Sequence, residues 1–575
     1  MADGSPSRPA LPHWLALAFL ALTFSLPSLL TRDLWNPDEP RYAQVAVEMR
    51  ADGDYVIPHL NGAIYAEKPP LFFWLSALLQ SLGLGIASGR IVTAMAAIGC
   101  LLITRELARL WFSERAGLLA AMVLASTLLF TWISKMGVLD VPLAFFTTLA
   151  AYGWFRHRRD GGAWSLLFFT GMGLATLIKG PVGLLIPCLA VAATLLVPGR
   201  PAAHSRHLLW GGLLTILIVG AWVVPACLQG GAEYTDTILL RQSVGRMVTS
   251  WSHRRPWYYY LTSLPIFLFP WIVFLPWAIV RQWKQHGDET DGAPRRLIIW
   301  YGLGLLFFSL ISGKRGRYMI PFLPPLAIVL GVFLDDALHS FRSGSARDWM
   351  RRSFSLQYML FLLLGLALCA VPLIAGDATA AARPDWGRGP SAVAEVIDRV
   401  GHERLIACAA SLWLVSLIGW WMARRGRFSR AIAAVLAGTI TLSLGMDLLL
   451  TPGLNHLKSG REVGRQLNEL VPPDGPGHVA LYPGAFSGVY NLYSGRVRMP
   501  VLSRPSDIDR FLEESPANAV ITNRDNYRRS GAEITIPHRV IEAKHVGHRT
   551  ILFLVADGTA GSGTGPAPDS EDPPG

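Results

Sequence analysis

Residues 163–198 read AWSLLFFTGMGLATLIKGPVGLLIPCLAVAATLLVP, two apolar runs that only the Lys-Gly-Pro turn at 179–181 separates. Each run is about as long as a helix must be to cross the hydrocarbon core of a bilayer, which takes ~17–25 residues. Similar runs recur along most of the chain, and 51% of its 575 residues are hydrophobic. A single soluble core could not bury so much apolar sequence. The sequence therefore predicts a mainly α-helical membrane protein that crosses the bilayer many times.

Apolar stretches of spanning length predict about thirteen transmembrane helices. The first stretch has no clear small-residue cleavage site and is too long for the core of a typical signal peptide, so we expect it to persist as a span. The stretches lie at residues 14–31, 88–109, 116–134, 138–155, 163–179, 181–198, 207–228, 258–281, 296–312, 318–338, 355–376, 405–423 and 429–450.

The distribution of basic residues assigns the two faces of the membrane. The run LFFWLSALLQSLGL at 71–84 is short for a span, and if it lies along the interface, every strongly basic short loop falls on one face. Cytoplasmic loops carry an excess of Lys and Arg, so that face is predicted to be cytoplasmic. The periplasmic face then receives the loop 32–87 with its interfacial helices, the turn around Asp140, the loop 229–257, the turn at 312–318 and everything after residue 450.

The net charge and the cysteines also limit the class of protein and the partners that we expect. The formal net charge of +12 would suggest a nucleic-acid partner in a soluble protein, but here the arginines cluster in short loops between apolar runs. We therefore expect a lipid bilayer and no nucleic acid as partner. The five cysteines show no CxxC or metal-like spacing and are expected to be packing residues, namely Cys100, Cys188, Cys227, Cys369 and Cys408.

The character of the sequence changes after about residue 450. Short alternating strands and helices follow, with a helix expected near SGREVGRQLNEL, a strand at HVALYP, a helix at SDIDRFLEES, and strands at NAVIT and TILFLVA. The last residues are rich in Gly, Pro and Ser and should be disordered. We therefore expect a transmembrane domain at 11–450, an extracytoplasmic α/β domain at 451–557 and a disordered tail at 558–575.

Ionisable and aromatic residues are unusually dense in the first outer loop, which contains NPDEPRYAQVAVEM (36–49), GDYVIPHLNG (53–62) and YAEKPPLFFW (65–74). Asn36 or Asp38 can cap a helix whose apolar face is Tyr42, Val45 and Met49. That structural role would be enough to explain the carboxylate. However, only 16% of the residues are charged, and charges that gather at membrane depth are functional by default. Both alternatives stay open for Asp38.

The same outer face presents a second carboxylate and several cations. Asp140 begins a span in KMGVLDVPLAFF, where it too can be a helix cap, and the cations occur in LIKGPVG, WSHRRPWYYY and SGKRGRYMIP. Outer basic residues can simply bind lipid headgroups, which is the alternative for Arg254, Arg315 and Arg317. Lys68, Lys179 and Lys314 instead lie beside Pro or Gly turns at span ends, which favours a functional role.

A basic cluster beside two carboxylates suits a phosphate-linked lipid substrate. A phosphate leaving group departs already ionised, so an enzyme needs cations to stabilise its growing charge more than it needs a general acid. A carboxylate can then accept a proton from an acceptor hydroxyl or orient an anionic acceptor. We expect Lys179, Arg255 and Lys314 to be among these cations.

In this order the motifs resemble the family of polyprenyl-phosphate-sugar glycosyltransferases with the GT-C fold, and within it the lipid A aminoarabinose transferase branch. The resemblance covers about residues 11 to 340. The matching segments within it are NPDEPRYAQVAVEM, GDYVIPHLNG, YAEKPP, VLD, KGP, HRRPWYYY and the turn from GK to RY. The resemblance implies a GT-C catalytic domain. The part after about residue 452 matches no motif of the family.

The resemblance also implies roles for single residues. Asp38 takes the catalytic position and Asp140 that of the second family aspartate. Glu67 and His253 would share a divalent metal ion, a poor closed site that water and the donor phosphate would have to complete. No organic cofactor is expected. The donor-phosphate site would be formed by Lys68 and, around it, Arg41, Tyr42, Tyr65 and Tyr318.

The function that follows is an inverting transfer of a sugar, expected to be 4-amino-4-deoxy-L-arabinose, from undecaprenyl phosphate to lipid A at the periplasmic face of a bacterial inner membrane. A near alternative keeps the fold but glycosylates another glycan, a lipopolysaccharide core or a protein. A more distant alternative is a transporter of a lipid-linked sugar. Transporters place paired ionisable residues near the membrane midplane, often within internal repeats, and neither feature is visible here.

Overall fold

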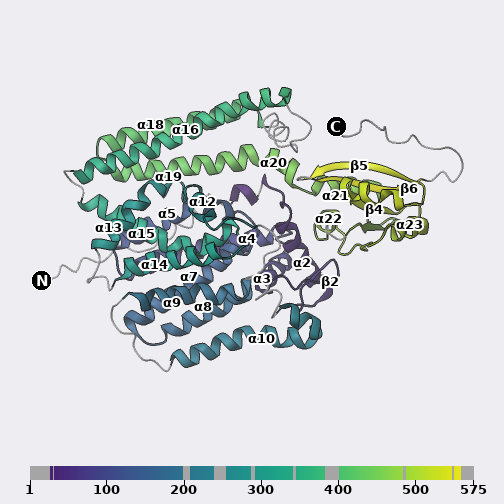
Figure 1. The fold of residues 1–575 in the computed structure, drawn as a ribbon, viewed down its shortest axis with the longest axis horizontal. Coiled ribbons are helices and arrows are strands. Elements are labelled where there is room, and N and C mark those ends of the chain that lie inside the picture. The colour runs from purple at the N-terminus through teal and green to yellow at the C-terminus, as the bar shows by residue number, and fades with distance from the viewer. Residues whose placement is uncertain are drawn as a thin grey trace. The chain divides into compact units, whose positions relative to one another are not determined.

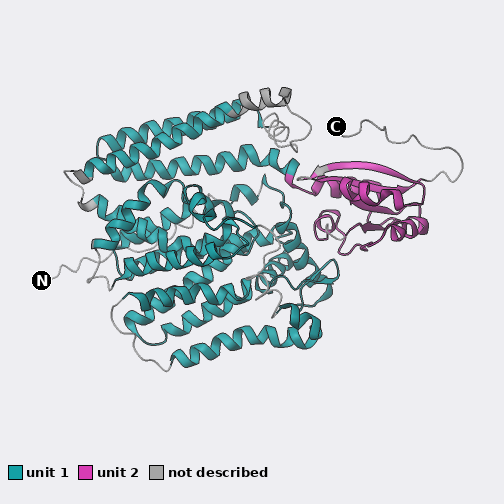
Figure 2. Ribbon diagram, in the orientation of Figure 1, with its two compact units in different colours: residues 1–457 teal, residues 458–575 magenta. Residues whose placement is uncertain are grey.

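The computed structural model of the chain describes residues 26–29, 31–197, 207–238, 254–285, 292–340, 345–381, 400–483, 487–546 and 549–557. The structure is mostly helical and divides into two compact units, residues 1–457 and 458–575, which Figure 2 distinguishes by colour.

Helices form almost every predicted span of the first unit. The only predicted span that lies largely outside the described residues is 14–31, of which 26–29 and 31 are described. The helices are α4 (Ser88–Arg109), α5 (Glu114–Ala125), α6 (Leu128–Ser134), α7 (Asp140–Asp160), α8 (Trp164–Lys179), α9 (Val182–Leu196), α10 (His207–Asp236), α12 (Tyr259–Phe267), α13 (Leu275–Gln285), α14 (Ala293–Leu310), α15 (Leu323–Ser340), α16 (Ser345–Ala381), α18 (His402–Arg424) and α19 (Phe428–Gly445).

Among the described residues, six helices are long and apolar enough to cross a membrane, or up to eight if each of two bent pairs counts as one span. The pairs are α5 with α6, bent by 67°, and α12 with the helical stretch 271–284, bent by 112°. Helices α8 and α9, with 16 and 15 residues, are shorter than this criterion requires. The coarse prediction of many spans is therefore confirmed, whereas the number thirteen stays a prediction.

Burial separates the central helices from those at the rim. The stretch 316–338, which ends in α15, is 94% buried and packs against α5, α14 and α13. By contrast, only 22% of the apolar window of α10 is buried, and Leu209 and Leu228 on that helix are 82% and 81% exposed. Figure 1 shows α10 at one edge of the unit and the paired α16 and α18 at another. Exposed apolar side chains on such helices are suited to contact lipid.

The first loop folds into a small layer of its own. It contains α2 (Asp38–Asp52), a hairpin of β1 (His59–Leu60) and β2 (Ala63–Ile64), and α3 (Leu71–Ser81). The predicted apolar face of α2 is confirmed, because Tyr42, Val45 and Met49 are all buried. The buried carboxylate of Glu48 accepts hydrogen bonds from the backbone N–H groups of Asn61 and Gly62, at 2.7 and 2.9 Å, and so fixes the hairpin on α2.

The predicted cap of this helix is wrong. The N-cap residue of α2 is Pro37, and no side chain caps the helix. Asp38 is the first helical residue, and its carboxylate turns to a cation from a distant segment instead. Asp140 likewise begins α7 without capping it, because the N-cap there is Leu139. Neither aspartate therefore has the structural role that was its alternative explanation.

The second unit contains a four-stranded sheet in the order β3-β4-β6-β5, in which only the β3–β4 pair is parallel. Apolar clusters lie on both faces of the sheet. Strand β5, with the sequence HRVIEAKHV, was not anticipated, because charged residues interrupt its apolar pattern. The elements are α21 (Arg461–Leu470), β3 (Val479–Leu481), α22 (Tyr490–Ser494), α23 (Pro505–Glu514), β4 (Ala519–Asn523), α24 (Arg524–Ser530), β5 (His538–Val546) and β6 (Arg549–Ala556).

Candidate active site

Two carboxylates from different helices meet at one arginine. Asp38 begins α2, Asp140 begins α7, and Arg317 comes from the short helix η3 (Gly316–Phe322) that precedes α15. The Nη2 atom of Arg317 lies 2.7 Å from Oδ2 of Asp38, and its Nε lies 3.6 Å from Oδ2 of Asp140. The guanidinium therefore bridges two carboxylates from different helices, and it lies 279 positions from Asp38 in the chain.

Two more cations complete this cluster. Lys179, the last residue of α8, forms an ion pair with Asp140, and its Nζ lies 4.9 Å from the ring centroid of Tyr318. The Nη1 atom of Arg315 lies 3.6 Å from Oδ2 of Asp38. The motifs that the sequence singled out separately, with Asp38, Asp140, Lys179 and Tyr318, are thus brought to one place.

The two aspartates differ in how far they reach solvent. The side chain of Asp140 is 4% exposed and is enclosed by Lys179 and Arg317. The side chain of Asp38 is 24% exposed. A buried carboxylate between two cations is best suited to position them, because its own access to a substrate is limited. Asp38 is the carboxylate that a substrate can reach.

Tyr42 lies one helical turn after Asp38 on the same face of α2. Its ring makes edge contacts with Phe72 and Phe73, with centroids 6.0 and 5.7 Å apart, and Tyr65 packs against Phe73 from the hairpin side. Burial, followed by the negative charge of Asp38, raises the pKa of Tyr42 well above its ordinary value. The phenol therefore stays protonated and is available as a hydrogen-bond donor.

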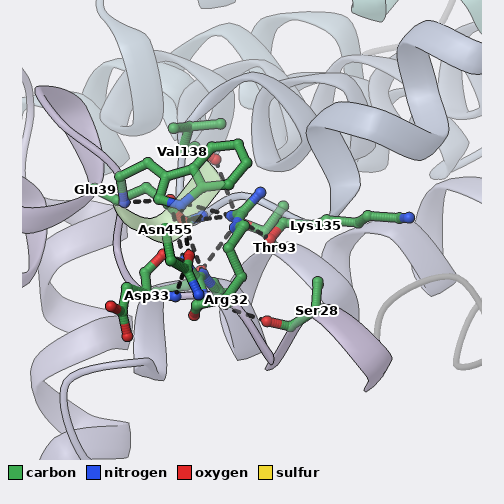
Figure 3. Close-up of polar contacts among 12 residues, drawn as sticks. Ser28, Arg32, Asp33, Glu39, Thr93, Lys135, Val138 and Asn455 are labelled. Carbon is green, nitrogen blue, oxygen red and sulfur yellow. Dashed lines mark hydrogen bonds and ion pairs between the residues drawn. The ribbon is translucent and has the colours of Figure 1, made fainter. Parts of the chain in front are cut away.

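Glu39, next to Asp38 in the sequence, has a structural role instead. Its buried carboxylate accepts hydrogen bonds from Nε of Arg90 at 2.8 Å, from Nη2 of Arg32 at 2.9 Å, and from the backbone N–H groups of Trp35 and Gly137 at 3.0 and 2.8 Å. Burial alone would raise the pKa of Glu39, but the charges of Arg90 and Arg32 outweigh it and lower that pKa. Figure 3 shows this network.

The network continues into the helices that follow α19. Asn455 of α20 (Thr451–Lys458) accepts hydrogen bonds from the backbone N–H of Asp33 at 3.0 Å and from Nε1 of Trp35 at 2.8 Å, and donates to the carbonyl of Thr31 at 2.7 Å. In the same region, Lys135 and Asp447 form a buried ion pair at 2.6 Å. The base of the first loop is therefore fixed to the last helices of the unit.

The other predicted donor-site residues differ in how they relate to this cluster. The charge of Lys68 interacts with that of Asp140, and its Nζ donates to the carbonyl of Glu67 at 3.0 Å. The buried Nε of Arg41 has no hydrogen-bond partner among the described residues. Arg255 is exposed beside the ring of Tyr259, with its Cζ 5.8 Å from the centroid. Lys314 is buried, and its Nζ donates to the carbonyl groups of Arg255 and Ile311. Lys314 thus fixes the turn that presents Arg315 and Arg317.

Arg317 is the main residue that the sequence analysis did not assign to the site. Lipid headgroup binding explained it well enough there, because a basic turn at a membrane surface is common. The available signal was its position directly before Tyr318 in SGKRGRY, combined with the two carboxylates of Asp38 and Asp140 that are predicted on the same face. Sequence spacing alone could not show that one guanidinium reaches both.

The predicted metal site is left with one described ligand. Glu67 is exposed, and His253 lies outside the described residues. Within the described ranges, no group of three or more His, Cys, Asp or Glu side chains could hold a metal ion. Glu67 alone cannot hold a metal ion, so its pairing with His253 stays a prediction.

Known proteins resemble this chain over most of its length. Residues 12–286 match the family model of dolichyl-phosphate-mannose-protein mannosyltransferases, and residues 254–376 match that of Alg9-like mannosyltransferases. Undecaprenyl phosphate-α-4-amino-4-deoxy-L-arabinose arabinosyl transferase 2 of Pseudomonas fluorescens is 30% identical over 73% of this chain and 68% of that protein. The corresponding transferase of Aeromonas hydrophila is 29% identical over 67% of this chain and 70% of that protein.

A solved structure shares the fold. The crystal structure of ArnT from Cupriavidus metallidurans bound to undecaprenyl phosphate is similar with a TM-score of 0.74, at 20% sequence identity, over 96% of this chain and all of that one. This similarity supports the GT-C architecture that the motifs predicted. It also supports a multi-pass membrane protein, in agreement with the apolar helices.

Proposed function

The chain belongs to the family of undecaprenyl phosphate-aminoarabinose arabinosyl transferases, and we propose that it moves 4-amino-4-deoxy-L-arabinose from undecaprenyl phosphate to lipid A. The observation that carries the proposal is the position of Arg317 between Asp38 and Asp140, with Lys179 beside them. Such a cluster supplies both the cations and the accessible carboxylate that transfer from a phosphate-linked sugar requires. The lipid-linked sugar transporter is set aside, because the relatives are named as transferases.

The cations beside Asp38 are suited to stabilise the leaving phosphate during sugar transfer. The acceptor oxygen forms a bond to the anomeric carbon while the bond from that carbon to the phosphate oxygen breaks, and the electron pair leaves with the phosphate. Cations that are already in place stabilise this developing charge without reorganisation. Arg317, Arg315 and Lys179 are the charges available beside Asp38. The protonated phenol of Tyr42 is a further donor on the same helix face.

Asp38 acts at the acceptor end of the reaction. Its carboxylate is held by Arg317 and Arg315 and is still 24% exposed. If the acceptor is a phosphate of lipid A, it is already ionised, and Asp38 positions the cations and the acceptor. If the acceptor is a hydroxyl group, Asp38 takes its proton. A single displacement of this kind inverts the configuration at the anomeric carbon.

The proposal extends to the donor site, the metal and the membrane topology. Lys68, Arg41 and Tyr65 of the first loop would hold the donor phosphate, and Glu67 and His253 would share any divalent ion with water and that phosphate. We place the site, the first loop and the second unit on the periplasmic face of a bacterial inner membrane, with about thirteen spans. The excess of basic residues in the short loops of the other face supports this orientation.

Mass spectrometry of lipid A tests the acceptor. Lipid A from cells that carry the gene should gain the mass of one aminopentose relative to lipid A from cells that lack it. A strain with the Asp38→Asn variant, expressed at the same level, should resemble the strain without the gene. An unmodified lipid A in the presence of well-expressed wild-type protein would rule out this acceptor and direct attention to other glycans or proteins.

A further inference from the structure

The segment 311–317, between the end of α14 and the first residues of η3, presents both arginines of the candidate active site and is called the arginine turn here. A distant part of the chain pairs with it through the backbone. The N–H of Arg255 donates to the carbonyl of Ser312 at 3.3 Å, and Arg254 forms an isolated antiparallel bridge with Gly313. The residues just before α12 therefore hold one side of the arginine turn.

Two buried side chains add polar contacts to the arginine turn. Lys314 donates from Nζ to the carbonyl of Arg255 at 3.1 Å. The hydroxyl of Tyr260, in the first turn of α12, donates to the carbonyl of Arg315 at 3.2 Å, and Tyr260 is only 1% exposed. The same carbonyl accepts the backbone N–H of Tyr318 at 3.0 Å. Tyr260 therefore bonds to the carbonyl at which the arginine turn passes into η3.

The last turn of α12 lies against the same place. A Cβ atom at Gly316 would lie 2.7 Å from Cζ of Phe267, so the ring of Phe267 occupies the space that a side chain at this position would need. Tyr260 and Phe267 are at positions i and i+7 of α12 and so lie on one face of the helix. Helix α12 thus supports the arginine turn at both of its ends.

The end of α12 is also fixed to the segment that leads to Asp140. Helix α12 ends where the chain bends by 112°, and α5 and α6 are separated by a bend of 67°. The two bends are joined, because the N–H of Leu128 donates to the carbonyl of Phe269 at 2.8 Å and Nε1 of Trp271 donates to Oγ of Ser126 at 2.9 Å. A short turn connects α6 to Asp140 at the start of α7. Helix α12 is therefore held between the arginine turn and the chain that carries Asp140.

The reach of Arg317 depends on this support. Helix η3 packs against both α7 and α12, and α12 packs against α6. The guanidinium of Arg317 lies 2.7 Å from Asp38 and 3.6 Å from Asp140. Polar contacts weaken with distance, so a small displacement of the arginine turn would lose one of the two carboxylates. A group that fixes the carbonyl of Arg315 thereby fixes the bridge.

We propose that Tyr260 is a positioning residue for the transfer reaction, because its hydroxyl holds the arginine turn where Arg317 reaches both carboxylates. This inference rests on the proposed function. Tyr260 is buried, so it acts through Arg317, whose charge is needed as the phosphate leaves. The proposed donor-phosphate residues lie on the first loop, whose hairpin is held by Glu48. Loss of the hydroxyl should therefore lower kcat and leave the KM for the donor nearly unchanged.

Steady-state transfer from undecaprenyl-phosphate aminoarabinose to lipid A in detergent tests this role. Tyr260→Phe removes only the hydroxyl, and kcat should fall about five- to tenfold, as for the loss of one hydrogen bond, while the donor KM changes by less than about twofold. The matched control is Tyr358→Phe, which should transfer at the wild-type rate. Tyr358 is also buried, and its hydroxyl also donates to a backbone carbonyl, that of Ala431 on α19.

A double-mutant cycle tests whether Tyr260 acts through Arg317. In the background of Arg317→Gln, the change Tyr260→Phe should cause almost no further loss of kcat, because the two residues serve one contact. Thermal unfolding of the same four proteins repeats the cycle without any substrate. The midpoint should fall less on Tyr260→Phe in the Arg317→Gln background than in wild type, because a turn without its ion pairs gains less from being held.

Three kinetic results would overturn the proposal. They are a wild-type kcat in folded Tyr260→Phe, an equal loss in Tyr358→Phe, and a further loss by the same factor in the Arg317→Gln background. Additive shifts of the unfolding midpoint would overturn it whatever the donor and acceptor are. Non-additive shifts together with no transfer by folded wild-type protein would instead contradict the proposed reaction and support the positioning role.

Discussion

At the residue scale, the adjacent acids Asp38 and Glu39 have opposite roles. Successive helix positions differ by about 100° in direction, so one carboxylate points to Arg317 and the other to Arg90 and Arg32. The sequence indicated that this pair of acids was important, and the family resemblance singled out Asp38. The burial of Glu39 and the bridge made by Arg317 depend on segments far away in the chain, which no local pattern shows.

The bridge predicts a large effect for Arg317→Gln. The variant removes the charge that joins Asp38 to Asp140, while Lys179 still neutralises Asp140. We expect transfer to fall by about 100-fold or more, as when a charge-stabilising donor is removed from an active site. Steady-state assays in detergent measure the rate of sugar transfer by the variant and by the wild-type protein.

The matched control for that variant is Arg281→Gln. Arg281 pairs with Asp336 at 3.7 Å, outside the candidate site, and its loss should leave transfer near the wild-type rate. Arg317→Lys should recover only part of the activity, because an ammonium group cannot reach both carboxylates in the same way. Full activity of Arg317→Gln would contradict the bridging role.

Glu39→Gln should destabilise the protein. The variant leaves Arg32 and Arg90 buried without their counter-charge, and breaking a buried ion pair on one side costs about 3–5 kcal/mol. Thermal unfolding in detergent should show a clear drop in midpoint. The control is Asp348→Asn, whose acid is 63% exposed and pairs with Arg351, and the expected cost there is under about 1 kcal/mol.

The pH dependence of the unfolding midpoint is a second test of the role of Glu39. Because the folded pKa of Glu39 is lowered, its contribution to stability is complete above the ordinary glutamate pKa and is lost as the pH falls through the folded value. The difference in unfolding midpoint between wild type and Glu39→Gln should therefore shrink in acid. A difference that does not depend on pH would contradict the ion-pair explanation.

At the scale of elements, apolar length predicted the helices well and their shapes poorly. The predicted span 116–134 is present as α5 and α6 with a bend of 67°, because the chain leaves the helix at Ser126 and Thr127. Hydropathy records how much apolar sequence a stretch contains, but bends depend on how neighbouring helices pack. Strand β5 was missed for a related reason, because its charges hide a pattern that the pairing with β6 makes stable.

The contact of α20 with the first loop is expected to matter for stability. Asn455→Leu keeps the branched shape and the number of side-chain heavy atoms but removes an acceptor for Asp33 and Trp35 and a donor for Thr31. Leaving partly buried polar groups without partners should cost about 2 kcal/mol. A lower unfolding midpoint together with faster proteolysis of the first loop is the expected result. An unchanged midpoint would show that α20 is not needed to hold the loop.

At the scale of the whole molecule, the sequence predicted the membrane class and the change of character near residue 450. Both features depend on amino-acid composition, which can be read from the sequence without knowing which residues are in contact. All described residues of the candidate active site belong to the first unit, and the second unit has apolar clusters of its own on both faces of its sheet.

The separate core predicts that residues 458–557 fold alone. The isolated segment should be soluble and monomeric and should unfold cooperatively on heating, as single domains of this size usually do. Circular dichroism measures whether the segment is folded, and thermal denaturation measures whether it unfolds cooperatively. A segment without cooperative unfolding would show that the second unit depends on the first for its fold.

The most direct test of the proposed reaction is transfer in detergent of radiolabelled sugar from undecaprenyl-phosphate aminoarabinose to purified lipid A. The proposal predicts transfer by the wild-type protein and a loss of transfer in Asp38→Asn, with an unchanged unfolding midpoint. Full activity of a folded Asp38→Asn protein would contradict the role of Asp38. Failure of both proteins to transfer, with both well folded, would contradict this donor and acceptor while leaving the fold in place.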